Sequence, residues 1–432
     1  MLGGGSFTAQ NKILPGTYIN FVSAANAAPG MSERGIAAVP LVLDWGPARE
    51  VFEVTSEQFQ KECQGIFGYP YDADEMKDLR ELYLSITKGV FYRLNSGTAA
   101  TNDFGTARYG GTRGNKLTIV IAKNVDDTTK FDVRTYLDGR GVDSQTVASA
   151  SALLDNDYVV FKKDAALAAT AGTPLAGGTD GEEITGSDHS DFLAAIESHS
   201  FHTLCCPATD EAIKALYIAF TKRLRDEAGV KFQTVVYRKN DVDYEGIISV
   251  ENEAVEKAHG LVYWVAGASA GCAVNRTNEN RVYKGEYTIK TDYTQTQLSD
   301  GILSGKYMFH KVADDIRVLM DINTLVNQTA EKNADFSNNQ TIRVLDQIGN
   351  DIAALFNSSY LGQVPNDEAG RVSFWNDIVT YGKQMSTIRA IEPLETDKIT
   401  VEKGQTKRAV VVNFPVEPIN CMGQLYMTVV VE

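Results

Sequence analysis

Apolar and polar positions change their spacing several times along the chain, and each change predicts a different kind of element. Apolar runs at residues 36–43, 51–54 and 90–94 are typical of buried strands. Residues 72–87 place apolar side chains three and four positions apart behind acidic residues, which predicts a helix. Ser56 is the expected cap of another helix.

The pattern changes after residue 95. Gly, Thr and Ala become frequent, and short β-like runs follow at residues 117–122, 131–137 and 158–162, separated by polar turns with little helical periodicity. Residues 97–178 are therefore predicted to form a small all-β insertion.

Beyond the insertion, helices and strands alternate again. Helices are expected at residues 188–199, 210–227 and near 253, and strands at 201–206, 232–238, 247–250 and 261–265. Strands separated by helices of this length predict βαβ crossovers and a mostly parallel sheet. Because the alternation starts before residue 95, the central α/β domain is expected to be discontinuous, comprising residues 23–96 and 179–285.

The last third of the chain predicts an α+β domain over residues 286–432. Its expected elements are β-rich segments at 287–293, 306–310 and 317–323, helices at 337–356 and 367–389, and two terminal strands. Residues 1–22 have too little apolar content for a core and predict an extended N-terminal arm. The fold class expected overall is multidomain, with α/β and α+β parts.

The two terminal strands are unusually apolar. The first contains Ala409, Val410, Val411 and Val412, and the second contains Leu425, Tyr426, Met427, Thr428 and Val429. An apolar strand at a sheet edge promotes aggregation unless another segment covers it. The cover is either another part of this chain or the same segment of a neighbouring copy, which would link subunits by strand addition.

Charge and composition exclude some functions. With 41 Lys and Arg against 56 Asp and Glu, the formal charge is −15, so the chain lacks the excess of cations that nucleic-acid binding requires. Five scattered cysteines suit a reducing cytoplasm better than a disulfide framework. No signal peptide and no run of about 18 apolar residues is seen, so we expect a soluble protein without direct membrane insertion.

One short motif is typical of hydrolases. Residues 267–271 have the Gly-x-Ser-x-Gly spacing of a nucleophile elbow, with Ser269 at its centre after an expected strand. A catalytic triad would also need a later histidine, and His310 is the only one after Ser269. A run of small residues at 266–273 that lets a helix approach its neighbours closely is the favoured interpretation.

Two groups of residues resemble metal-binding motifs, but neither has the arrangement that a metal site needs. His199, His202, Cys205 and Cys206 crowd together, but they span a helix end and an apolar strand whose alternate residues face opposite sides. Residues 241–252 begin like a calcium loop but end in Asn where a bidentate Glu belongs. No catalytic, cofactor or metal site is predicted.

Four segments together resemble contractile tail sheath proteins. Residues 111–119 resemble the Gly-x-x-Gly-Asn turn and strand that open the inserted domain of that family, and residues 175–181 resemble its Leu-x-Gly-Gly-Thr-Asp-Gly exit. Residues 321–325 and 418–431 also resemble the family. The resemblance is strongest to sheaths of phages and of phage-tail-like particles, including bacteriocins, of Gram-positive bacteria.

The resemblance implies a structural function without a cofactor. Family members stack as hexameric rings around an inner tail tube protein, between baseplate and tail terminator proteins, and contract to drive the tube through the target envelope. They assemble in the bacterial cytoplasm and end in the virion tail or a released particle.

The resemblance also implies that both ends of each subunit are lent to neighbours. The lent N-terminal strand would contain Tyr18, Ile19, Phe21 and Val22. The lent C-terminal strand would be residues 425–429, and residues 409–412 would belong to the receiving sheet. A serine hydrolase built on Ser269 and a soluble α/β ligand-binding protein are the alternatives.

Overall fold

The computed structural model describes residues 31–431. In this part of the chain, the central sheet has seven strands in the order β13-β12-β11-β10-β1-β3-β2. These strands are β1 (Ile36–Leu41), β2 (Val51–Thr55), β3 (Lys88–Arg93), β10 (Thr203–Cys206), β11 (Gln233–Tyr237), β12 (Ile247–Val250) and β13 (Lys306–Tyr307). All pairings are parallel except that of β2 with β3. The predicted, mostly parallel α/β sheet is confirmed.

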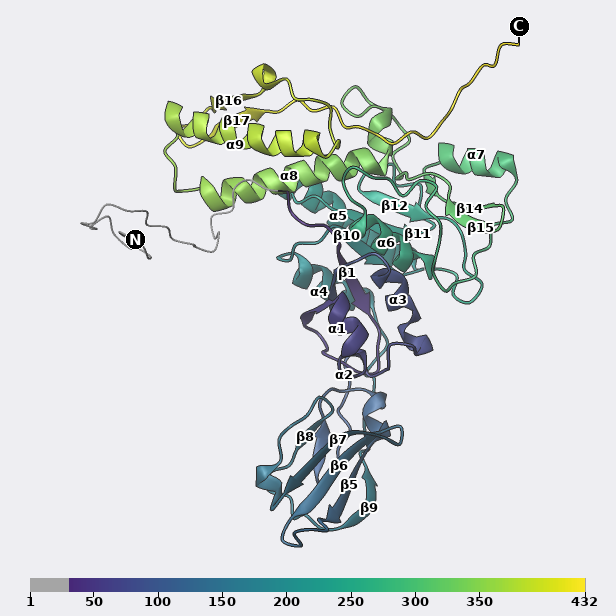
Figure 1. Cartoon of the computed structure of the whole chain (residues 1–432), viewed down its shortest axis with the longest axis vertical. Coiled ribbons are helices and arrows are strands. Elements are labelled where there is room, and N and C mark those ends of the chain that lie inside the picture. Colours follow the sequence, from purple (N-terminus) through teal and green to yellow (C-terminus); the bar gives the residue numbers. More distant parts are fainter. Residues whose placement is uncertain (1–30, 432) are drawn as a thin grey trace, which may run out of the picture. The chain divides into compact units, whose positions relative to one another are not determined.

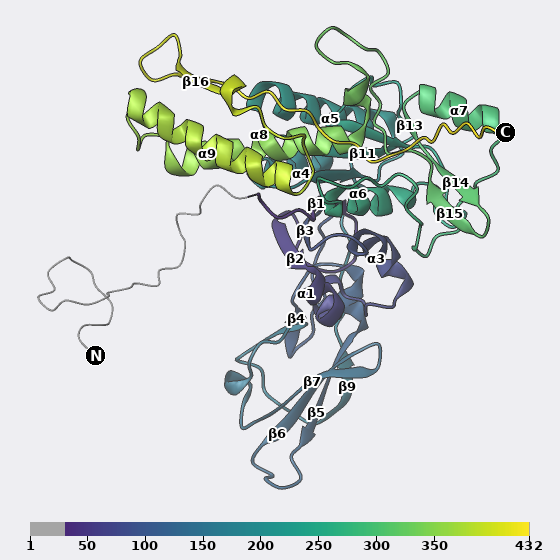
Figure 2. The same cartoon turned by 45° about the horizontal axis from the view of Figure 1, so that its top comes forward.

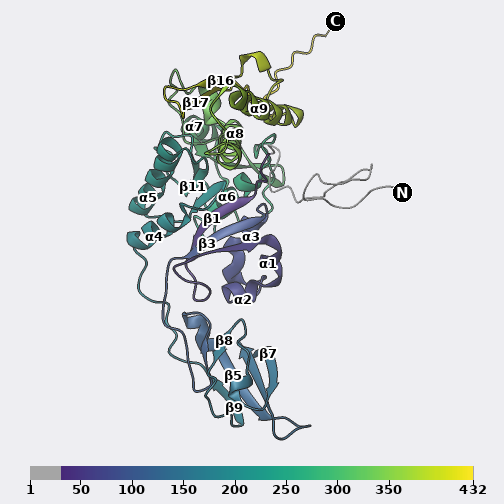
Figure 3. The ribbon, with the colours of Figure 1, turned by 90° about the vertical axis from the view of Figure 1, so that its left-hand side faces the viewer.

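Helices cover both faces of this sheet (Figure 3). Helices α1 (Ser56–Lys61), α2 (Cys63–Phe67), α3 (Lys77–Tyr83) and α6 (Leu261–Gly271) share a core with Ala37 and Val39 of β1. Helices α4 (Gly186–Ile196) and α5 (Glu211–Lys222) share a second core with Ala38. Successive residues of β1 thus enter opposite cores, as the two-residue period of a strand requires.

Three local predictions for the central domain are wrong. Residues 261–265 begin helix α6 instead of a strand, and no helix forms near residue 253. The helix expected to be capped by Ser56 is capped by Thr55, whose Oγ1 accepts a hydrogen bond from the N–H of Gln58 at 3.2 Å. Gln58 Oε1 accepts in return from the Thr55 N–H at 3.0 Å, which completes a capping box that Ser56 cannot form from inside the helix.

The inserted segment folds as β-structure with its own core (Figure 1). It has a four-stranded antiparallel sheet in the order β7-β6-β5-β9, formed by β5 (Leu117–Lys123), β6 (Phe131–Leu137), β7 (Arg140–Val147) and β9 (Thr170–Pro174). β4 (Gly105–Ala107) pairs with β8 (Val159–Phe161). Buried Ile119, Val133 and Leu153 belong to this core, and Trp45 of the central domain packs into it as well.

The insertion leaves and rejoins the central sheet at one narrow neck. The Asn95 side chain donates from Nδ2 to the carbonyl of Asp180 at 3.1 Å, which joins the two crossing segments. Gly181 has φ +84°, and a Cβ at this position would lie 1.8 Å from the carbonyl oxygen of Ser96. Only glycine permits so close an approach of the two backbones.

The described chain divides into two compact units. One contains residues 350–417 with Met31 and Ser32, and the other contains residues 33–349 and 418–431. The larger unit also holds α7 (Gln295–Leu303), β14 (Phe309–Val312), β15 (Asp315–Val318) and the π-helix η4 (Arg223–Ala228). The predicted domain boundaries remain predictions.

The smaller unit is built from helices and a hairpin (Figure 2). It contains the end of α8 (Asn339–Ser359), the whole of α9 (Glu368–Thr387), and the strands β16 (Thr400–Lys403) and β17 (Val410–Asn413). Asp351 of α8 accepts hydrogen bonds from Ser32 Oγ at 2.6 Å and from the Tyr381 hydroxyl of α9 at 2.8 Å. These bonds attach the start of the described chain to this unit.

Candidate subunit-linking surface

The hairpin of β16 and β17 is a small sheet supported by helices. Its register pairs Val401 with Val412. Val410, Val412 and Phe414 face the core formed by α8 and α9, and the indole Nε1 of Trp375 donates to the carbonyl of Ile399 at 2.9 Å. A two-stranded sheet alone is marginally stable, so the helices provide most of its support.

Both outer edges of this hairpin are open within the described chain, because the sheet has only two strands. Gly404 N–H donates to the Ala409 carbonyl at 2.8 Å, so Ala409 points its backbone groups toward β16. The antiparallel pattern then turns those of Val410 and Val412 away from it. The predicted receiving residues Val410, Val411 and Val412 lie in β17, and Ala409 directly precedes it; their receiving role remains a prediction.

The C-terminal segment is extended and exposed. Within the single chain no strand forms over residues 421–431, because a strand needs a partner and the described chain offers none there; the predicted terminal strand stays a prediction. Leu425 is 84% exposed, Tyr426 88%, Met427 73% and Val429 72%, and Thr428 is exposed too. So many adjacent exposed apolar side chains are typical of an interaction site. The predicted linking role of Tyr18, Ile19, Phe21 and Val22 concerns residues outside the described part.

A buried glutamine holds the start of this segment. Gln340 of α8 donates from Nε2 to the carbonyl of Ile419 at 2.9 Å, and its Oε1 accepts from the N–H of Cys421 at 3.0 Å. Thr341 Oγ1 donates to Asn420 Oδ1 at 3.2 Å. The glutamine amide makes the two backbone hydrogen bonds that a neighbouring strand would make. It therefore fixes where the exposed segment begins. Sequence reasoning missed Gln340, because its role depends on a contact 79 residues away.

Family models match successive parts of the chain. They are the tail sheath protein Gp18 domain III N-terminal region at residues 34–83, the phage tail sheath protein beta-sandwich domain at 95–180, the phage tail sheath protein central domain at 182–324 and the phage tail sheath C-terminal domain at 331–432. The phage-like element PBSX protein XkdK of Bacillus subtilis is 33% identical, with all of both chains covered. The chain belongs to the phage tail sheath family.

Solved structures agree with this assignment. The sheath tail protein of Desulfitobacterium hafniense is 36% identical to this sheath protein, with a TM-score of 0.80, covering 93% of this chain and 96% of that one. The helical sheath of the anti-feeding prophage in its contracted state shares the fold, with a TM-score of 0.57, 11% identity and coverage of 96% and 98%. Tail sheath proteins are structural subunits of contractile injection systems and not enzymes.

The hydrolase alternative fails on geometry. In this sheath protein Ser269 lies near the end of helix α6, 1% exposed, and its Oγ has no hydrogen-bond partner among the described residues. A nucleophile elbow needs a strand-to-helix turn that exposes the serine. His310 lies in β14, where burial and the charge of Arg317 lower its pKa. The favoured interpretation holds: a Cβ at Gly267 would lie 2.3 Å from the carbonyl of Leu82, so the small residues let α6 approach α3 closely.

The ligand-binding alternative would place its ligand in one crevice of this sheath protein. At the carboxyl ends of β1 and β10, where the strand order reverses, lies a cavity of about 410 Å³, the usual ligand position in such sheets. Some of its polar side chains are paired: Lys257 Nζ lies 2.5 Å from Asp78, and His189 Nδ1 lies 2.8 Å from the hydroxyl of Tyr217, which does not line the cavity. Asp210, which also lines the crevice, caps helix α5 with its carboxylate, so these groups already have partners within the chain.

Metal binding needs a cluster of ligands, and a membrane-spanning helix needs length and apolar side chains. Within residues 31–431, no cluster of three His, Cys, Asp or Glu could hold a metal ion. Cys205 and Cys206 are buried in β10, and burial raises the pKa of both thiols. None of the helices in the described chain has the combined length and apolar content needed to cross a bilayer.

Proposed function

We propose that this chain is the repeating subunit of a sheath that stacks as hexameric rings around an inner tail tube protein and contracts to drive that tube through a target envelope. The observation that carries the proposal is that one chain has both an exposed apolar segment, residues 425–431, and an open strand edge at β17. Strand and edge are the two halves of a β-augmented sheet. Baseplate and tail terminator proteins would contact the two ends of the stack.

Strand exchange would give neighbours a flexible tether. Backbone hydrogen bonds would hold the lent strand in the receiving sheet, while the linking segment lets the globular bodies rotate. The central sheet, the helices on its two faces and the inserted domain would move together with each subunit. Such a mesh can survive a large rearrangement without dissociating.

Contraction would need no cofactor if the extended sheath is a kinetic trap and the contracted sheath buries more complementary surface. The anti-feeding prophage sheath, which shares this fold, is described in a contracted state. Assembly in the bacterial cytoplasm, followed by residence in a virion tail or a released particle, fits this proposal.

The test is assembly of purified full-length protein, followed by negative-stain electron microscopy. Unmodified protein is expected to form rings or tubes, and forms lacking residues 1–22 or 421–432 are expected to stay soluble monomers. The matched control is Met422→Ala, which removes an equally exposed apolar side chain just before the predicted strand. Normal tubes from both shortened forms would rule out strand exchange.

A further inference from the structure

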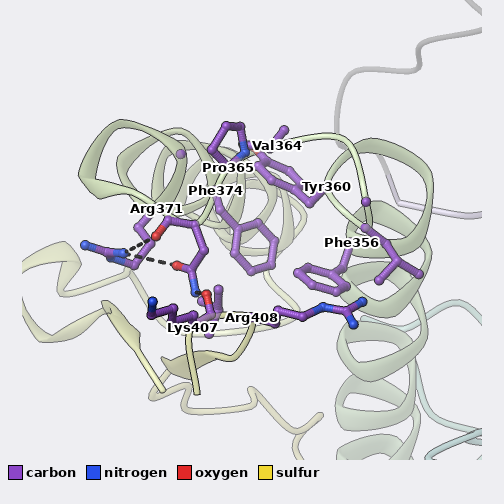
Figure 4. Close-up of a pocket in the computed structure, with 13 residues that line it drawn as sticks. Phe356, Tyr360, Val364, Pro365, Arg371, Phe374, Lys407 and Arg408 are labelled. Carbon is purple, nitrogen blue, oxygen red and sulfur yellow. Dashed lines mark hydrogen bonds between the residues drawn. The ribbon is translucent and has the colours of Figure 1, made fainter. Parts of the chain in front are cut away.

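A cavity in the smaller unit lies directly beside the open edge of β17. Its volume is about 210 Å³, and its floor is formed by the rings of Phe356, Tyr360 and Phe374. Figure 4 shows these three rings around the hollow. Ring centroids lie 5.5 Å apart for Phe356 and Phe374 and 4.6 Å apart for Tyr360 and Phe374, so the floor is an aromatic cluster. We call this cavity the aromatic socket.

The rim of the aromatic socket is cationic. Arg371, Lys407 and Arg408 line it, and no Asp or Glu of residues 31–431 does. In the described chain none of the three forms an ion pair with a carboxylate. An apolar floor with a cationic rim favours an aromatic side chain, because a guanidinium attracts the face of a ring.

The socket is built before any occupant arrives. Arg371 Nη1 donates to both the carbonyl and the Oδ1 of Asn366, each at 3.0 Å. Asn366 Nδ2 in turn donates to the carbonyls of Lys407 at 3.1 Å and Ala409 at 2.8 Å. This chain of bonds ties the start of α9 to the hairpin turn, so little ordering cost remains for binding.

Size points to a single ring. A cavity of about 150 Å³ lined by apolar side chains accepts benzene. The aromatic socket is larger at about 210 Å³ and therefore has room for a phenol. Filling it would also shield Phe374 and Val410 from water.

Position points to a strand from another copy. Val410 lines the socket and is also the first residue of β17, so a strand added along the outer edge of β17 passes the mouth of the socket. Among the described residues 418–431, Tyr426 is the single aromatic residue, and it is 88% exposed. Its hydroxyl donates to Gln424 Oε1, two residues away, at 2.9 Å.

We infer that the aromatic socket receives the Tyr426 ring of a second copy and sets the register of the lent C-terminal strand. The inference rests on the proposed strand exchange. A one-residue slip of a strand turns every side chain to the other face. An aromatic anchor at one end of the receiving strand prevents this slip, which backbone hydrogen bonds alone do not.

The decisive experiment uses two variants that share Cys421→Ser, which removes the exposed cysteine, and that each have one introduced cysteine. One variant has Tyr426→Cys and the other has Val364→Cys at the socket mouth. The two proteins are assembled together, oxidised and separated on a non-reducing denaturing gel. The expected result is a disulfide-linked dimer in the mixture that is not seen when either variant is assembled alone.

Other outcomes overturn the inference in distinguishable ways. Tubes without a heterodimer would reject the socket and leave strand exchange standing, whereas failure of unmodified protein to form tubes would reject the proposed function itself. A heterodimer of Val364→Cys with Phe21→Cys instead would assign the socket to the N-terminal arm. A cross-link within single chains of the double variant, with none in the mixture, would assign it to the same copy.

Assembly thresholds supply a second readout. Tyr426→Ala is expected to raise the protein concentration needed for tubes by about 10- to 100-fold, as expected for exposing one aromatic side chain. Tyr426→Phe keeps the ring and should restore most of the loss, and Met422→Ala should have no effect. Equal thresholds for Tyr426→Ala and Met422→Ala would contradict an anchoring role.

Discussion

The side-chain oxygen of Gln340 accepts a hydrogen bond from the backbone N–H of Cys421 at 3.0 Å, while the same amide donates to the carbonyl of Ile419 at 2.9 Å. One side chain thus satisfies two backbone groups of the segment that precedes the exposed residues. The side chain is nearly buried, at 2% exposure. The origin of the exposed C-terminal segment is therefore fixed to helix α8, while its apolar end is not held.

Replacing Gln340 by Met should release this origin, because Met has a similar length but cannot make either bond. We expect the amide hydrogen of Cys421 to exchange about tenfold faster and the free energy of unfolding to fall by about 1–3 kcal/mol. Hydrogen exchange read by mass spectrometry measures the first effect. Gln405→Met, at an exposed turn, is the control; equal exchange in the two variants would show that Gln340 does not hold the segment.

Arg225 and Asp346 form a buried ion pair between η4 and α8. Two hydrogen bonds of 2.6 and 2.9 Å join them, and their side chains are 4% and 10% exposed. Arg225→Met should lower the free energy of unfolding by about 3–5 kcal/mol, because the carboxylate is left buried and unpaired. Urea unfolding followed by circular dichroism measures this loss.

The surface pair of Arg223 with Glu197 provides the control for that prediction. Its side chains are 46% and 43% exposed, so Arg223→Met should cost no more than about 1 kcal/mol. The double variant Arg225→Met with Asp346→Leu should regain most of the loss, because no buried charge remains. Similar losses in the double variant and in Arg225→Met would show that the pair itself, not the orphaned charge, sets the stability.

His202 predicts a dependence of stability on pH. Its Nδ1 accepts from the N–H of Ile36 at 3.3 Å, and burial together with the charge of Arg34 lowers its pKa to about 3. An unfolded histidine takes up a proton near pH 6.5. Between these values the unfolded state binds a proton that the native state does not, so stability falls as the pH is lowered.

The fall attributable to His202 should reach about 1.4 kcal/mol per pH unit between pH 6.5 and 3. His202→Asn retains a hydrogen-bond acceptor but does not titrate, so its stability should fall less steeply over this range. Urea unfolding at successive pH values measures both slopes. Parallel slopes for the two proteins would exclude His202 as the titrating group.

Ser269→Ala should stabilise the protein. The Oγ of Ser269 is buried and has no hydrogen-bond partner within residues 31–431, and burying an unbonded hydroxyl costs about 1–3 kcal/mol. We expect a gain of about 1 kcal/mol in the free energy of unfolding and unchanged assembly. A loss of stability, or labelling of the unmodified protein by a fluorophosphonate probe, would contradict this account of the site.

The sequence predicts the central sheet well and one of its helices badly. Strands such as Ile247–Val250 are short apolar runs between turn signals, and the structure confirms them. Residues 261–265 form the same kind of run, but they begin a helix whose residues are buried on every side as far as Ala270. A fully buried helix has no polar face, so its periodicity carries no information. Polar strand Arg140–Val147 was missed for the opposite reason, because few of its residues are buried.

The linking surface could be predicted only in part. Apolar composition identifies residues 409–412 and 425–429 as β-formers, but a propensity does not say which chain supplies the partner. The Gln340 contact and the aromatic socket depend on side chains brought together from distant segments. One chain of hydrogen bonds joins Arg371, Asn366 and Lys407 across 41 residues of sequence, and no local sequence pattern predicts it.

The Asn95 bond to Asp180 brings the two crossing segments of the neck within reach of one side chain. None of the seven strands of the central sheet comes from the 84 residues between them. A short peptide joining residue 95 to residue 180 could replace the appendage while the host keeps its strand order. The neck thus predicts that the inserted domain can be enlarged, shortened or replaced by a foreign domain at the same place.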